Sequence, residues 1–526
     1  MDIKKSIEES YIFNIFLFIK RLLDTSFIFN VKKENKDNAN EISGEYKTWK
    51  EHSLIYALII KLDKKLNKLE KFIHNSIIES KIYNILNRKN VDDREIKKSL
   101  NNPVIENSKV VLYFRKIKDK LRVEDVLIAL TTGYIFVDIF IRRISFTSSF
   151  GSIWDELLLI FLFVYIFYSR IANNGDINFN LTPMGLPATI YIVLGIIHLI
   201  VVSPDLSVAV EGFRAVFQQV LWYFAITQFV RNQSDSNKVI NIMIGMGLFL
   251  GIHATYQYIA KVPMPGNWVD ISENVRTRAF SIVGSPNVLG ALFVLFIPIG
   301  ISMLLVNKNK NSRIFYMLSV LFMILGLFFT MSRGAWLAFG FSMFIFIMII
   351  NIKLLVPFIA LVGVFILSGS LMAQRLLFML SPSYMMSSAK GGRLYRWRIG
   401  IDIWKKNKFF GVGLGRFGGA VAINNKLSPF YLDNYYLKTL TEMGIYGILA
   451  LAFVIVCFVL FSSKIIKYQN DMKSKLISIG LFTGGIGILT QNFVENIFEV
   501  PAMAIYFWVI IALINTFAPK KTILNK

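Results

Sequence analysis

The feature that most constrains this chain is a series of apolar runs, each about as long as a bilayer is thick. A helix needs roughly 20 predominantly apolar residues to cross the hydrocarbon core. The chain is 54% hydrophobic with a mean hydropathy of +0.53. This is more apolar side chain than a water-soluble core of this length can bury. The sequence therefore predicts an all-α, polytopic membrane protein with about 12 transmembrane helices.

The predicted spans follow one another closely, with one long interruption. They lie at residues 126–144, 153–171, 184–202, 205–229, 239–260, 287–306, 313–331, 334–351, 353–371, 435–461, 474–493 and 499–517. Residues 372–434 form a large loop between the ninth and tenth spans. Residues 1–122 hold nearly half of the charged residues and predict a charged, amphipathic N-terminal region without a cleavable signal peptide. Residues 123–526 form the transmembrane domain.

The distribution of basic residues predicts the orientation. An even number of spans places both termini on one side, and loops rich in Lys and Arg face the cytoplasm. The N-terminal region is predicted on that side, together with Lys308, Lys310, Arg313, Lys353, Lys464, Lys467, Lys473, Lys475, Lys520, Lys521 and Lys526. We therefore expect a multi-pass protein of the cell membrane with both termini in the cytoplasm and the 372–434 loop outside.

Charge and metal-ligating residues exclude several classes of protein. The net charge is +24, but the basic residues are spread over the loops and ends of apolar segments, so nucleic acid is not an expected partner. The single cysteine, Cys457, lies inside an apolar run and cannot form a disulfide within one chain. The four histidines are scattered, and no zinc-type cluster of ligands is visible.

The predicted outer loop, residues 372–434, runs against the charge rule. It holds ten basic residues and two acidic ones. Long loops translocate largely regardless of charge, so the topology survives, but the excess needs a cause. The guanidinium fork of arginine suits a lipid-linked phosphate or diphosphate. The alternative is a loop that contacts anionic lipid headgroups.

Three patterns within this loop indicate how such a site is built. In GGRLYRWRIGIDIW, Arg393, Trp397 and Trp404 recur at helical spacing and predict a short interfacial helix. FFGVGLGRFGG is either a turn whose N–H groups bind phosphate or a flexible return loop. Asp433 precedes an apolar helix, where it is either an N-cap or a carboxylate facing the outer site.

Ionisable residues within or beside spans default to functional hypotheses. Glu211 and Arg214 share a helical face, either as a structural pair or as part of a site. The topology places Arg276, Arg278, Arg333 and Glu495 on the same outer side as the basic loop and Asp433. This convergence predicts one outer-face site.

The motifs FTMSRGAWLAF, GGRLYRWRIGIDIWKKNKFFGVGLGRFGG and LDNYYLKTLTEMGIYGILA, in this order, resemble the O-antigen ligase/polymerase superfamily domain. RTRAFSIVGSPNVLGALF resembles the segment upstream in that family. The resemblance covers about residues 126–517. It implies a GT-C-like, inverting, metal-independent glycosyltransferase without a cofactor. Its substrates are undecaprenyl-diphosphate-linked oligosaccharides, as donor and acceptor, and its implied partners are a flippase and a chain-length regulator.

The resemblance also assigns residues. It implies that arginines hold the donor diphosphate, here Arg214, Arg278, Arg333 and Arg393, of which Arg333 and Arg393 are candidate catalytic residues. Further candidate substrate-binding residues are Arg276, Arg396, Asn434, Tyr435 and Glu495. The ligases commonly have an outer-loop histidine before an Asn-x-Tyr-Leu-type motif. Here the position reads Asp433-Asn434-Tyr435-Tyr436-Leu437, which favours a polymerase with Asp433 as a candidate general base.

Three functions remain open from the sequence. The favoured one is an extracytoplasmic polymerase of a bacterial cell-surface polysaccharide. The second is a ligase that passes lipid-linked glycan to a final acceptor. The third, of another class, is a transporter or flippase for an anionic solute, although such proteins place binding groups near the bilayer midplane, often within repeats. No internal repeat is visible here.

Overall fold

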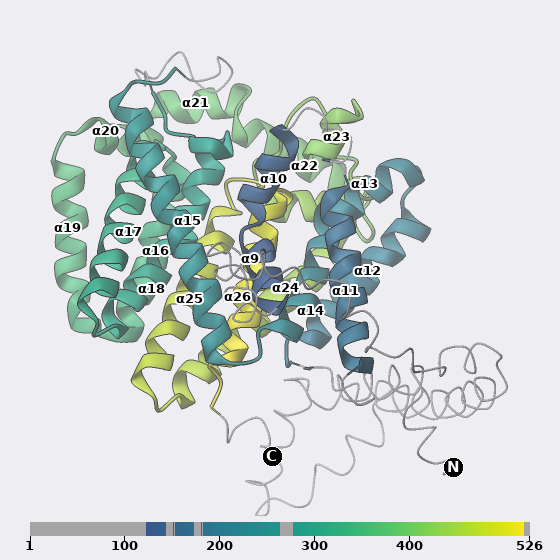
Figure 1. Cartoon of the computed structure of the whole chain (residues 1–526). Coiled ribbons are helices and arrows are strands. Elements are labelled where there is room, and N and C mark those ends of the chain that lie inside the picture. Colours follow the sequence, from purple (N-terminus) through teal and green to yellow (C-terminus); the bar gives the residue numbers. More distant parts are fainter. Residues whose placement is uncertain are drawn as a thin grey trace, which may run out of the picture. The chain divides into compact units, whose positions relative to one another are not determined.

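The structure of the chain is a computed structural model. It describes residues 123–143, 151, 153–172, 180, 182–263 and 277–519 (Figure 1). The predictions for residues 1–122, for Arg276 and for the basic tail at Lys520, Lys521 and Lys526 lie outside the described residues.

The described residues are helical, without strands. The longer helices are α9 (Val123–Thr132), α10 (Tyr134–Arg143), α11 (Trp154–Ala172), α12 (Gly185–Ile197), α13 (Leu206–Val216), α14 (Gln218–Phe229), α15 (Gln233–Ile259), α16 (Pro286–Val306), α17 (Lys310–Phe329), α18 (Arg333–Ile350), α19 (Leu355–Leu367), α22 (Arg393–Lys406), α24 (Tyr435–Tyr468), α25 (Met472–Gln491) and α26 (Pro501–Thr516). Shorter elements are η4 (His198–Val202), η6 (Ser281–Val283), η7 (Ile352–Leu354), α20 (Leu371–Leu377), η8 (Phe378–Leu380), α21 (Pro382–Lys390), α23 (Ala420–Asn424) and η9 (Ile497–Glu499).

Polar side chains fix where the long helices begin. The Ser285 hydroxyl accepts a hydrogen bond from the Val288 N–H, and Pro286 occupies the first turn of α16. The Asn434 side chain caps α24 by accepting from the Leu437 N–H at 2.9 Å. Asp433 is therefore not the N-cap of this helix, one of the two roles that the sequence left open for it.

Among the described residues, seven helical segments are long and apolar enough to cross a membrane: α12 with η4, α15, α16, α17, α18, α24 and α25. The count becomes eight if η7 with α19 and α20 with η8, which meet at a bend of 96°, form one broken span. Two predicted spans are each broken into two short helices, 126–144 near Gly133 and 205–229 at Phe217. The count of about 12 therefore stays a prediction.

The chain divides into two compact units. The described part of the smaller unit is 123–127, 163–172, 180 and 182–183, where the Tyr165 hydroxyl donates to Glu124 Oε1 at 3.1 Å. The larger unit comprises residues 128–162 and 184–525 and is called the main unit below. All of the candidate site described below lies in the main unit.

α16 is the centre of a helical bundle in the main unit. It packs against α15, α17, α18 and α25, which surround its label in Figure 1. In the most apolar stretch of α16, 83% of the residues are buried. The corresponding share is 33% in α17 and in α18, so these two helices present apolar surface outward. α24 packs against α12, α22 and α25, and α26 packs against α14.

Outward-facing apolar side chains identify the surroundings of the bundle. None of the α19 side chains is buried, and Val356 and Leu367 are 74% and 85% exposed. Soluble monomers rarely expose contiguous apolar surfaces of this kind, whereas lipid tails cover them without cost. The main unit is therefore that of a multi-pass membrane protein.

Candidate functional site

Several helices end at the same place in the main unit. α16, α18 and α24 begin there, and α17 and α25 end there. Hydrogen bonds join these ends: residue 278 is bonded to 287 and 330, residue 491 to 287, and residue 434 to 496. The side-chain amide of Gln491 donates to the backbone carbonyl of Asn287 at 3.0 Å, which ties the end of α25 to the start of α16. Polar side chains gather at this end of the bundle.

A chain of contacts links two of the predicted arginines through a carboxylate. Glu495 Oε1 pairs with the Arg393 guanidinium and accepts a hydrogen bond from Asn287 Nδ2 at 2.9 Å. The Asn287 carbonyl-type oxygen Oδ1 in turn accepts from Arg278 Nη2 at 3.0 Å. Glu495 is only 9% exposed, so its ionised form depends on these partners.

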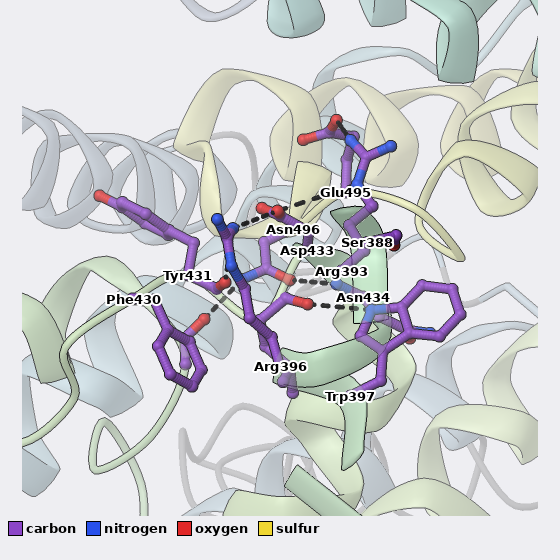
Figure 2. A network of polar contacts seen from close by, with 12 residues as sticks. Ser388, Arg393, Arg396, Trp397, Phe430, Tyr431, Asp433, Asn434, Glu495 and Asn496 are labelled. Atoms are coloured by element: carbon purple, nitrogen blue, oxygen red, sulfur yellow. Dashed lines mark hydrogen bonds and ion pairs between the residues drawn. The ribbon is translucent and has the colours of Figure 1, made fainter. Parts of the chain in front are cut away.

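A second carboxylate adjoins the first. Asp433 Oδ2 accepts from Arg396 Nη1 at 2.7 Å and lies 3.8 Å from Arg393 Nε (Figure 2). Arg393 therefore lies between Asp433 and Glu495 and contacts both. We call Arg278, Arg393, Arg396, Asp433 and Glu495 the arginine–carboxylate cluster.

The environment shifts the pKa values of this cluster. Burial raises the pKa of Glu495 to about 7, and the nearby Arg393 charge offsets only part of the effect. Burial also raises the pKa of Asp433, against the opposing charges of Arg393 and Arg396. Burial lowers the pKa of Arg278 to about 10; Glu495 counteracts this lowering, whereas Arg333 and Arg393 add to it. Such shifts are common where groups are arranged for proton transfer.

Arg333 reaches the same region from a tight turn. It is the first residue of α18, and its guanidinium carbon lies 4.8 Å from the centroid of the Tyr384 ring. The turn before it is held on two sides, because the Thr330 carbonyl accepts from Arg278 Nε and the Met331 carbonyl from Arg375 Nε, each at 2.9 Å. The charges of Arg333 and Arg278 repel each other, which an anionic ligand would relieve.

α22 is the short helix that the sequence predicts over GGRLYRWRIGIDIW, and its interfacial position stays a prediction. Arg393 and Arg396 lie in its first turn, where the helix dipole is positive, and the carboxylates of Glu495 and Asp433 compensate both charges. The Trp397 indole donates to the Leu432 carbonyl at 3.0 Å, which fixes this turn against the segment that carries Asp433.

The glycine-rich loop at residues 411–419 is tied to the rest of the main unit by several of its own N–H groups and is not a free return loop. Four of its N–H groups donate within the protein: Val412 to the Thr441 carbonyl, Gly413 to the Glu442 carbonyl, Leu414 to Ser203 Oγ and Phe417 to Glu442 Oε1. Its glycines allow close approach, because a Cβ on Gly411 would lie 2.4 Å from the Glu442 backbone. The loop is thus a firmly attached wall, and these four N–H groups do not face a phosphate.

Sequence reasoning missed a buried ionic network behind the cluster. Lys438 Nζ lies 2.6 Å from Glu442 Oε2 and 3.2 Å from Glu499 Oε1, and all three side chains are nearly inaccessible. We call these residues the Lys438 triad. The signal was present, since Lys438 and Glu442 are ionisable residues one helical turn apart at the start of an apolar span.

Other predicted residues lie in different surroundings. Arg214 forms an ion pair with Glu156 of α11, whereas Glu211 accepts from Asn425 Nδ2 at 2.9 Å. The Glu211–Arg214 pair, one of the two alternatives that the sequence left open, is therefore not seen among the described residues. Tyr435 is buried, with its ring 5.4 Å from that of Phe498, and it lines a small apolar cavity. It is placed as a core residue, and Asn434 as a helix cap.

The bundle and the cluster together define a helical membrane protein with an arginine-rich polar site at one end. Residues 318–452 match the family model of the O-antigen ligase family (Wzy_C). Over these residues the match confirms the resemblance to the O-antigen ligase/polymerase superfamily. It runs from α17 into α24 and includes Arg333, Arg393, Arg396 and Asp433, whereas Arg278 and Glu495 lie outside it. No curated protein matches the chain.

Proposed function

We propose that this protein is an extracytoplasmic glycosyltransferase that polymerises a bacterial cell-surface polysaccharide. Its donor would be a glycan on undecaprenyl diphosphate, and its acceptor a sugar hydroxyl of a lipid-linked repeat unit. The observation that carries the proposal is the grouping of Arg278, Arg393 and Arg396 around two carboxylates at one end of the bundle, with Arg333 beside them.

This grouping suits the leaving group of such a reaction. The acceptor oxygen attacks the anomeric carbon, the bond from that carbon to the diphosphate breaks, and undecaprenyl diphosphate leaves with the electron pair. Guanidinium groups that are already fixed in a shielded site stabilise the developing negative charge. Arg393 is best placed for this role, because its contacts to Glu495 and Asp433 hold it at the centre of the cluster.

The acceptor hydroxyl must lose its proton in the same reaction. A carboxylate within hydrogen-bond reach can take it, most effectively when its pKa is near the working pH. Asp433 is the base that the sequence predicts, and Glu495 shares Arg393 with it. We propose that this pair of carboxylates receives the proton and that no metal or cofactor takes part.

A ligase remains the second candidate, because the family model that matches residues 318–452 is described as O-antigen ligase. The absence of a histidine at the Asp433-Asn434-Tyr435 position favours the polymerase. The cell membrane as location, cytoplasmic termini, a cytoplasmic region over residues 1–122, and a flippase and chain-length regulator as partners all belong to this proposal.

Analysis of lipid-linked glycans in a deletion strain tests the proposal. A polymerase predicts that polymer disappears and single lipid-linked repeat units accumulate, and that the gene restores chain length. Normal lipid-linked polymer that fails to reach its final acceptor would establish the ligase instead. Purified protein that moves substrate across vesicles without forming glycosidic bonds would establish a transporter.

A further inference from the structure

Asn496 follows Glu495 in the chain, and its side chain reaches the backbone on both sides of Asp433. Asn496 Oδ1 accepts a hydrogen bond from the Asn434 N–H at 3.1 Å. Its Nδ2 donates to the Gly418 carbonyl at 2.7 Å, and the same carbonyl accepts from the Leu432 N–H at 2.9 Å. One amide therefore holds the residue after Asp433 directly and the residue before it through Gly418.

Asp433 needs such support. Its φ is +53°, in the left-handed region that few residues with a side chain adopt, although Asp and Asn do so more readily than the others. Conformations of this kind persist where the surroundings determine them, and they cluster at functional sites. Here the hydrogen bonds donated by the neighbouring N–H groups of Leu432 and Asn434 hold the backbone of Asp433 in this conformation.

Asn496 is itself fixed from behind by the Lys438 triad. Its Nδ2 lies 3.2 Å from Glu499 Oε2, and Glu499 pairs with Lys438. Glu442, the third member, accepts from the Phe417 N–H at 3.1 Å, next to Gly418. Because buried charges must keep their partners, this array resists displacement. It connects the start of α24, the glycine-rich loop and the segment that carries Glu495.

We propose that Asn496 is a positioning residue, which joins the Asp433 and Glu495 segments so that both carboxylates keep a fixed geometry around Arg393 during proton transfer. Figure 2 shows Asn496 beside Asp433, Asn434 and Glu495. The inference rests on the proposed glycosyltransferase activity. Asn496 acts through these residues and does not itself need to touch the substrate.

Steady-state kinetics of the full-length Asn496→Ala protein test this role. The assay uses the purified protein in phospholipid vesicles, with the lipid-linked repeat unit extracted from the deletion strain as donor and acceptor. We expect kcat to fall about 100-fold, as for a misplacement of about 1 Å, while KM changes little. The acid limb of the pH profile should move to lower pH, since a loosened site lets water reach Glu495 and moves its pKa toward the ordinary value.

Two further variants complete the test. Asn425→Ala removes an exposed hydrogen bond to Glu211 and should leave kcat and the pH profile unchanged. Glu499→Gln keeps the neutral Lys438–Glu442 pair and should shift kcat and the acid limb in the same direction as Asn496→Ala, by less; it decides the matter if Asn496→Ala does not fold. Wild-type kcat and pH profile in these variants would overturn the positioning role alone. A wild-type protein that joins no repeat units would overturn the proposed function, and this inference with it.

Discussion

The guanidinium of Arg393 contacts the carboxylate of Glu495 although the two residues are 102 positions apart in the chain. One residue begins α22, and the other lies between α25 and α26. Asp433 approaches the same guanidinium from the start of α24, with 3.8 Å between its Oδ2 and Arg393 Nε. The three segments are thus held together by the Arg393 side chain, which contacts both carboxylates, and Asp433 is also paired with Arg396.

Replacing Arg393 should remove most of the activity. Arg393→Ala takes away the central cation and leaves Glu495 buried without its ion-pair partner, so we expect kcat to fall about 10²- to 10³-fold. Arg393→Lys keeps the positive charge but loses the planar guanidinium that can bind a phosphate or carboxylate through two hydrogen bonds, so it should retain an intermediate rate. The length of polymer formed from lipid-linked repeat units measures both effects.

Arg398→Ala is the matched control for this experiment. Arg398 lies on the same helix and is exposed, so its removal lowers the net charge by the same amount without touching the cluster. Equal loss in Arg393→Ala and Arg398→Ala would show that overall charge, rather than the position of Arg393, determines activity.

The pattern of apolar runs predicted most of the helices, because burial in lipid demands long uninterrupted apolar segments. Helices α16 to α18 and α25 lie within three residues of the predicted ranges, whereas α15 begins six residues earlier and α24 ends seven residues later than predicted. The points at which helices bend or break were harder to predict from the sequence. Gly444 leaves helical geometry inside α24, with φ +65° and ψ −160°, where the Phe409 backbone approaches too closely for a side chain. That contact depends on a segment 35 residues away, which local sequence does not reveal.

The candidate site was predictable in its residue types and less so in its pairings. Counting spans and charges led to Arg278, Arg393, Asp433 and Glu495, because ionisable residues are costly beside apolar spans. The partner of Arg214 was not predictable. Glu211 lies three residues away on the same helix, but the observed partner is Glu156, from another helix. Choosing between such partners requires the packing of the helices.

Asp433→Asn should inactivate the protein with little effect on its fold. Asparagine tolerates the left-handed conformation of this position and has the same shape, so it keeps the backbone while losing the charge and the basic oxygen. If Asp433 is the base, kcat should fall about 10²- to 10⁴-fold, with KM little changed. An active Asp433→Asn protein, measured beside Glu495→Gln, would assign the proton to Glu495.

Activity should depend on pH in the neutral range. A carboxylate accepts a proton only when it is ionised, and burial raises the pKa of Glu495 to about 7, so the rate should fall as pH decreases through that value. Because the pKa of Glu495 is higher in the folded protein than in the unfolded chain, protonation of Glu495 stabilises the folded state. This contribution to the free energy of unfolding is fully present below the ordinary pKa of glutamate and is lost as pH rises through about 7. A Glu495→Gln protein should lose this pH dependence of stability. Rates and unfolding midpoints between pH 5 and pH 9 measure both effects.

Gly419→Ala should destabilise the wall of the site. A Cβ at this position would lie 1.9 Å from Glu499 Oε1 and 2.4 Å from Lys438 Cε, so the Lys438 triad would have to move. Overpacking of this kind costs typically about 1–3 kcal/mol. Gly363→Ala in α19 meets no atom within 4 Å and is the matched control. The thermal midpoint of the detergent-solubilised protein should fall for the first variant and not for the second.

Cysteine labelling should establish the orientation of the main unit. The only native cysteine, Cys457, is buried, so introduced cysteines report their own positions. Lys426 and Lys473 are both exposed, the first in the predicted outer loop and the second at the start of α25 on the predicted cytoplasmic side. A membrane-impermeant maleimide should label Lys426→Cys in intact cells, and Lys473→Cys only after permeabilisation. The reverse pattern would place the arginine–carboxylate cluster on the cytoplasmic side, where the glycans of an extracytoplasmic polymerase are not found.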